Sequence, residues 1–356
     1  MVERQSSKVG LLAWWSVLLA VGILAKDDLP PKRGLTYIRN DDPHNGDYDI
    51  LLSEKSPLTW YFTWSPIPAP RDTFPKGAES RVEFVPTLPS TDNLDDNVKA
   101  LDRVPKSSEH LFTFNEPDGT TDSGGSSITP EDAAKAYIEK IVPLRERFLI
   151  SHPSVTGSSR GLDWLDDFNS SCWDIDADNG CPADFVVAHW YGPFEGLVSW
   201  LDQLSGWYNQ SGSSIEKDVK IWVSELGLAQ ADSDTTFDMM KRTLPYLDQL
   251  DDVEKYAWFG VFRPKEANSW TGDSLALFEN DGGLSELGAY YLGGEENGFK
   301  PGQQGQPSGG NGNNSGNGGN GDDDDDDDDD GDANGAIGLR TSLWILFFVF
   351  CMIWIL

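Results

Sequence analysis

Short apolar runs, rich in β-branched and aromatic residues, recur along the central part of the chain. Several are apolar almost throughout, which is typical of parallel strands covered on both faces. The runs that predict strands are 34–38, 58–65, 81–88, 110–116, 148–155, 185–191, 220–225 and 255–262.

Stretches between most of these runs have the periodicity of amphipathic helices. The clearest covers 129–147, where Thr129 is a suitable N-cap, Pro130 suits the first turn, and Ala133, Tyr137 and Ile141 fall on one face. Further helices are predicted at 93–104, 162–168, 198–208, 235–250 and 284–291. The segment 66–80 contains four prolines and predicts a long loop.

This alternation of strand and helix, repeated eight times, predicts a single (β/α)8 TIM barrel of the α/β class. We assign the catalytic domain to 26–300. A doubly wound open sheet is the alternative, but no glycine-rich nucleotide turn follows the first strand. In a barrel the chemistry lies where the strands end, so acidic residues at strand ends are informative.

The two ends of the chain carry apolar runs that predict processing signals. Basic residues precede an uncharged run ending at Ala25, which predicts a signal peptide over 1–25, with a short membrane anchor as the alternative. Small residues around Asn334 precede a terminal apolar run, which predicts a GPI attachment signal over 334–356, with attachment at Asn334. A tail-anchored protein is the alternative.

The segment 301–333 predicts a disordered C-terminal linker, because it is rich in Gly and Asn and ends in a run of nine Asp. Calcium binding by the Asp run is the alternative reading, although nothing in the sequence orders the ligands. Together with the two terminal signals, this linker predicts an extracellular protein at the cell surface, attached to the membrane by a lipid.

The 356-residue chain has a formal net charge of −32 and contains three cysteines. Such a charge excludes the basic surface that nucleic-acid binding needs. In a secreted chain, Cys172 and Cys181 predict a short-loop disulfide. Three sequons are consistent with secretion and predict glycosylation at Asn169, Asn209 and Asn313.

Two glutamates stand at predicted strand ends. Glu116 ends the fourth strand and Glu225 ends the seventh. Strict alternation would place Glu116 on the face of Phe112 and Phe114, and Glu225 on the face of Ile221 and Val223. If these faces point inward, both carboxyls rise from the barrel mouth.

Two carboxyls across a cleft are the minimum equipment for hydrolysis of a glycosidic bond, since one protonates the leaving oxygen and the other attacks or activates water. The alternative is that Glu116 and Glu225 are surface acids that happen to end strands and have no catalytic role. The sequence contains no serine nucleophile elbow or P-loop, and its four histidines are too scattered to read as a zinc site. We therefore expect no cofactor and no metal.

The motifs Asn115-Glu116-Pro117-Asp118 and Ser224-Glu225-Leu226-Gly227 resemble those of the retaining glycosidases built on (β/α)8 barrels. More narrowly, the stretches 60–65, 163–168, 189–192 and 281–288 are similar to glycoside hydrolase family 128, the alkali-sensitive-linkage-like catalytic core. The similarity covers 33–294. It implies a β-1,3-glucan hydrolase, with β-glucan as its partner.

The resemblance implies that Glu116 is the acid/base, that Glu225 is the nucleophile, and that Asn115 binds the sugar 2-hydroxyl. His189 and Tyr191 would line the subsite and orient Glu225. Thr63 departs from the family pattern, in which an Asn is expected before the Trp.

Three tryptophans at strand ends are candidate sugar-stacking platforms, namely Trp64, Trp190 and Trp258. Trp222 is instead expected to pack against helices, as part of the core. A glucan transglycosylase and a non-catalytic glucan-binding wall protein remain alternatives to hydrolysis, and a monomer is expected.

Overall fold

The computed structural model describes residues 30–38, 45–70, 72–210, 212–215 and 218–305. The predicted signal peptide, most of the predicted linker and the predicted GPI signal lie outside these residues, as do Asn313 and Asn334. Among the helices of this part of the chain, none combines the length and the apolar character needed to cross a membrane.

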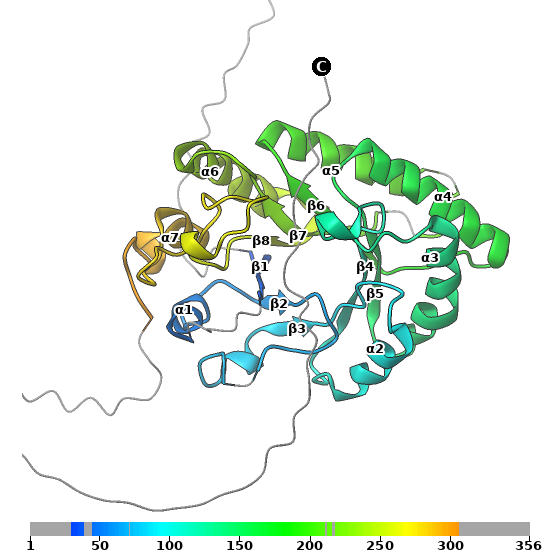
Figure 1. Cartoon of the computed structure of the whole chain (residues 1–356), viewed down its shortest axis with the longest axis horizontal. Coiled ribbons are helices and arrows are strands. Elements are labelled where there is room, and N and C mark those ends of the chain that lie inside the picture. Colours follow the sequence, from blue (N-terminus) through cyan, green and yellow to red (C-terminus); the bar gives the residue numbers. More distant parts are fainter. Residues whose placement is uncertain (1–29, 39–44, 71, 211, 216–217, 306–356) are drawn as a thin grey trace, which may run out of the picture.

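Eight parallel strands form the centre of the molecule, and helices surround them (Figure 1). The strands are β1 (Arg33–Thr36), β2 (Trp60–Phe62), β3 (Glu83–Val85), β4 (His110–Asn115), β5 (Leu149–Ser154), β6 (Phe185–Tyr191), β7 (Lys220–Gly227) and β8 (Val253–Trp258). Their order is β3-β2-β1-β8-β7-β6-β5-β4. A parallel bridge between Thr87 and Phe112 brings the two edges together. The predicted TIM barrel is therefore confirmed.

The helices follow the strands, as predicted for most of them. They are α1 (Asn45–Leu51), α2 (Leu94–Ala100), α3 (Pro130–Ala136), α4 (Ser159–Ile175), α5 (Phe194–Tyr208), α6 (Ser233–Gln249) and α7 (Glu286–Tyr291). The sequence did not predict α1, and the helix predicted at 162–168 is shorter at both ends than α4. α4 begins early because the Ser158 side chain accepts a hydrogen bond from the Gly161 N–H.

The helix predicted over 129–147 is helical throughout 130–146, but its geometry changes on the way. Thr129 caps α3 as expected, by accepting a hydrogen bond from the Asp132 N–H. A π-helical turn (Tyr137–Ile141) and a 3₁₀ segment (Val142–Glu146) follow. Pro143 explains the change, because proline lacks the N–H that an α-helix would need there.

Two apolar clusters hold the barrel together. The larger one joins the outer faces of the strands to the helices and includes Ile221, Val223 and Phe114. The smaller one consists of strand residues only and fills the barrel interior, where Trp60 and Trp222 pack with ring centroids 5.1 Å apart. Trp222 is core, as expected, but it lies inside the barrel rather than against helices.

The outer position of Ile221, Val223 and Phe114 contradicts the strict alternation assumed for β4 and β7. In β7 the register against β6 shifts, so that Ala188 pairs with Val223 but His189 pairs with Glu225. Ser224 is thus the extra residue of a bulge. Both Trp222 and Glu225 consequently face the barrel interior. The register of β4 against β5 shifts twice, and at the second shift, between Thr113 and Asn115, the extra residue lies in β4.

Candidate functional site

A cavity of about 930 Å³ opens at the carboxyl ends of the strands. One side is aromatic and comes from the segments after β1 and β8, with Tyr37, Tyr48, Phe259, Phe262 and Trp270. The other side is small and polar and comes from the segments after β3 and β4, with Ser90, Thr121, Ser123 and Ser126. Glu116 and Glu225 both line this cavity. An apolar wall with a few polar groups suits the binding of a small organic or sugar ligand.

Glu225 is held on the floor of the cavity by two hydrogen bonds. The Trp64 indole N–H donates to Oε1 at 2.8 Å, and the Tyr191 hydroxyl donates to Oε2 at 2.7 Å. Glu225 is only 6% exposed. Each carboxylate oxygen thus has a donor that stabilises its negative charge, and the side chain is fixed in one orientation.

Glu116 follows β4 directly and adopts a left-handed backbone conformation, with φ of 40°. Its N–H donates to the Ser154 carbonyl at 2.7 Å, and its own carbonyl accepts from the Gly119 N–H at 2.9 Å. A Cβ on Gly125 would lie 2.5 Å from that carbonyl oxygen, so this close approach requires glycine. A strained backbone held by its surroundings is typical of functional sites.

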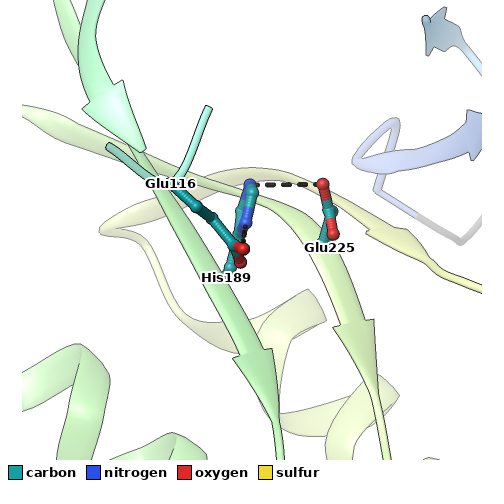
Figure 2. A group of neighbouring side chains, drawn as sticks. All are labelled: Glu116, His189 and Glu225. Carbon is teal, nitrogen blue, oxygen red and sulfur yellow. Dashed lines mark hydrogen bonds and ion pairs between the residues drawn. The ribbon is translucent and has the colours of Figure 1, made fainter. Parts of the chain in front are cut away.

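His189 lies between the two carboxyls (Figure 2). Its Nδ1 is 2.9 Å from Oε1 of Glu116, and its Nε2 is 3.6 Å from Oε1 of Glu225. One oxygen of each glutamate and one His189 nitrogen lie within 4.8 Å of one another. This short spacing fits a retaining glycosidase, whose carboxyls are about 5–5.5 Å apart, and not the ~6.5–9.5 Å of inverting enzymes.

Burial raises the pKa of Glu116, and the negative charges of Glu225 and Asp118 raise it further, while His189 opposes them. Burial alone would lower the pKa of His189, but the three carboxylates around it outweigh burial and raise that pKa. The negative charges of Glu225 and Asp118 therefore favour a proton held by the Glu116–His189 pair.

The same three residues, Glu116, His189 and Glu225, form a group whose donor atoms are of the kinds that bind divalent cations. Both oxygens of Glu225 already accept hydrogen bonds from Trp64 and Tyr191. The internal hydrogen bonds fit a paired-carboxylate site better than a metal centre.

The structure brings most of the predicted site residues together. Asn115 lines the cavity and donates to the Gly124 carbonyl at 3.2 Å. Tyr191 contacts Glu225 as expected, whereas His189 lies closer to Glu116 than to Glu225. Trp64 lines the cavity, but it also binds Glu225 through its indole N–H.

Two predicted stacking platforms lie elsewhere. Trp258 has no exposed surface and donates to the Leu275 carbonyl at 3.1 Å, which contradicts the substrate-binding role expected for it. The Trp190 ring packs near Gly157, Gly192 and Gly196 and is not part of the cavity wall. Both residues point outward from their strands, where side chains meet helices.

Sequence reasoning missed the best exposed aromatic in the cavity. Trp270 is 37% exposed, and its ring centroid is 4.6 Å from that of Tyr191. It lies in the long segment after β8, among Asn, Ser, Thr and Gly. A tryptophan in such a polar segment at the catalytic end of a barrel is a signal that could have identified it.

The other predicted residues that the structure describes lie away from the cavity. Cys172 and Cys181 form the expected disulfide, which joins the end of α4 to the loop before β6. Asn169 is half-buried within α4 and donates to the Gly212 carbonyl, while Asn209 is exposed at the end of α5. Thr63 is buried and binds backbone carbonyls of the following loop, including that of Ile67.

Comparisons with known proteins agree with this geometry. The curated alkali-sensitive linkage protein 1 of Schizosaccharomyces pombe is 28% identical over 271 residues, which is 73% of this chain. The chain spans only 44% of the length of that relative.

Among solved structures, a family 128 subgroup III curdlan-specific exo-β-1,3-glucanase from Blastomyces gilchristii, in complex with glucose, is 25% identical, with a TM-score of 0.54. The match covers 73% of this chain and 97% of that one. A family 128 subgroup I endo-β-1,3-glucanase from Amycolatopsis mediterranei, in complex with laminarihexaose, shares the fold at 22% identity, with a TM-score of 0.54. That match covers 74% of this chain and 99% of the other.

These neighbours confirm the resemblance to family 128. The family model described as glycosyl hydrolase catalytic core matches residues 34–291, which is most of the chain. With two carboxyls, a bridging histidine and an aromatic wall at the mouth of the barrel, the chain belongs to the glycosyl hydrolase catalytic core family.

Proposed function

We propose that the protein is a retaining glycosidase that cleaves β-1,3-glucan. The observation that carries this proposal is the close pair of Glu116 and Glu225 at the wall of one cavity. The names of the similar solved structures, which include exo- and endo-β-1,3-glucanases, support the choice of substrate. The aromatic side of the cavity offers faces that match the apolar C–H surface of a glucose ring.

In the first step, a carboxylate oxygen of Glu225 attacks the anomeric carbon and forms an ester. The glycosidic C–O bond breaks, and the proton of Glu116 moves to the departing oxygen. In the second step, Glu116 takes a proton from water, whose oxygen attacks the anomeric carbon and releases Glu225. Asn115, beside Glu116 in the cavity, would bind the sugar 2-hydroxyl.

The spacing of the two carboxyls leads us to expect net retention of the anomeric configuration. Proton NMR of a β-1,3-glucan digest should detect the β-anomer as the first product, before mutarotation. First release of the α-anomer would overturn the mechanism. The same spectra report any longer oligomers, which would reveal transfer to a sugar in place of hydrolysis.

We propose in addition that the mature enzyme acts as a monomer outside the plasma membrane, held by a GPI lipid. The proposal rests on the sequence at the two ends, together with the exposed sequon at Asn209 and the Cys172–Cys181 disulfide. Its role would be the remodelling of cell-wall glucan.

Phosphatidylinositol-specific phospholipase C should release the enzyme from washed membranes into the supernatant. The expected control is an Asn334→Pro variant, which should carry no lipid and should not depend on the phospholipase. Release of the native protein by salt alone would count against the anchor.

A further inference from the structure

Asp118 is the acidic residue of the Asn115–Asp118 motif to which the reaction assigns no role. Its side chain has no exposed surface. Its Oδ1 accepts the Thr156 N–H at 2.9 Å, and its Oδ2 accepts the Thr156 hydroxyl. The Arg160 Nε lies 3.6 Å from Oδ2, although the Arg160 side chain itself is largely exposed. Donors on both oxygens fit an ionised carboxylate.

These contacts join the turn that carries Glu116 to the neighbouring unit of the barrel. Thr156 follows β5, and its hydroxyl lies 3.0 Å from that of Ser158, which caps α4. Glu116 itself donates its N–H to Ser154 at the end of β5. The left-handed conformation of Glu116 is therefore braced on both sides, by its own N–H and by Asp118 two residues later.

The charge of Asp118 also acts on the catalytic cluster. The charged and titratable groups facing Glu116 are His189 and Tyr191 from β6, Glu225 from β7 and Asp118 from its own turn, with Arg160 of α4 beyond Asp118. The negative charge of Asp118 raises the pKa of Glu116 and that of His189. Since His189 is buried and the Glu116 side chain is only 15% exposed, water screens this field poorly.

We propose that Asp118 is a positioning residue for the acid/base Glu116, an inference that rests on the proposed function. Its buried carboxylate fixes the turn on which Glu116 sits, and its negative charge favours the protonated form that donates to the leaving oxygen. Asp118 is not among the residues that line the cavity, so we expect it to act without touching the sugar.

An Asp118→Asn variant tests the charge. The amide oxygen can still accept the Thr156 N–H, so the turn keeps one of its contacts while the charge is lost. We expect the alkaline limb of the kcat/KM profile on β-1,3-glucan to move to lower pH. On that limb, activity should fall about threefold to tenfold relative to wild type.

The matched control is Asp163→Asn, which removes the same charge from an exposed position on α4 and should leave the profile unchanged. A lower kcat with an unmoved limb in Asp118→Asn would overturn the electrostatic role.

Two further variants test the brace and remain informative if Asp118→Asn does not fold. Thr156→Val removes the hydroxyl but keeps the charge, and Thr156→Ser restores the hydroxyl. We expect Thr156→Val to lower kcat/KM for natural glucan several-fold and to be rescued by Thr156→Ser. It should leave kcat/KM for aryl glycosides with acidic leaving groups unchanged, because that constant reports the first step, in which such leaving groups need no proton. An equal loss on both substrates would overturn the proposal, because a general structural defect does not distinguish leaving groups.

Histidine ring NMR provides a readout that needs no activity. The chain has four histidines, and burial lowers the pKa of His152 to about 4, so its titration is separate from that of His189. The His189 signal, assigned with a His189→Gln variant, should titrate at lower pH in Asp118→Asn. An unmoved titration would overturn the inference. Failure of the wild-type enzyme to cleave β-1,3-glucan would instead overturn the proposed function.

Discussion

Replacing Glu225 with glutamine should abolish turnover, with a loss on the order of 10⁵-fold or more in kcat, because an amide cannot form the glycosyl ester. The variant should still fold. The oxygen of the new amide can accept the Trp64 N–H, and its NH₂ can donate to the Tyr191 hydroxyl oxygen, so both contacts survive.

Initial rates on β-1,3-glucan oligomers, with thermal unfolding as the check on folding, measure this effect. A matched control is Glu254→Gln, which removes a carboxylate that binds Trp222 and does not line the cavity. A folded Glu225→Gln enzyme with more than about 1% of wild-type turnover would contradict the covalent mechanism.

Replacing Glu116 with alanine should lower kcat on natural glucan by about 10²–10⁴-fold, since the leaving alkoxide then departs without a proton. Aryl glycosides with acidic leaving groups should lose little in the first step. Their glycosyl-enzyme should accumulate, because no base activates water. Added azide should attack this ester and give a β-glycosyl azide.

A Glu116→Gln variant separates two effects of the alanine change. The glutamine amide cannot supply the proton, but its oxygen can still accept from His189, whose Nδ1 is 2.9 Å from Oε1 of Glu116. Similar losses of kcat in both variants would show that the loss comes from the missing proton donor and not from the lost contact with His189. Rescue of Glu225→Ala to an α-azide, with no effect on Glu116→Ala, would reverse the two roles.

The eight strands and the positions of Glu116 and Glu225 could be predicted because each depends on local composition and on the rule that barrel chemistry lies at strand ends. The side of the sheet to which each side chain of β4 and β7 points could not be predicted. A bulge such as that at Ser224 depends on pairing with a neighbouring strand, and it reverses the alternation that the sequence implies.

The aromatic residues of the cavity illustrate a second limit. Trp258 and Trp270 are indistinguishable by residue type, yet the first is buried behind its strand and the second lines the cavity. The difference arises because Trp258 stands on the outer face of β8, whereas Trp270 belongs to the segment after that strand. Tertiary packing determines both the facing of the strand and the path of the segment. His189 likewise shows no sequence sign of its contact with Glu116, because 73 residues separate the two.

In the proposed mechanism, the hydrogen bonds from Trp64 and Tyr191 to Glu225 would act in opposite directions on the two steps of the reaction. By stabilising the free carboxylate, they make it a weaker attacking group when the ester forms. By the same stabilisation, they make it a better departing group when the ester is cleaved. The lifetime of the ester is thereby shortened, and an acceptor sugar has less time to reach it before water does.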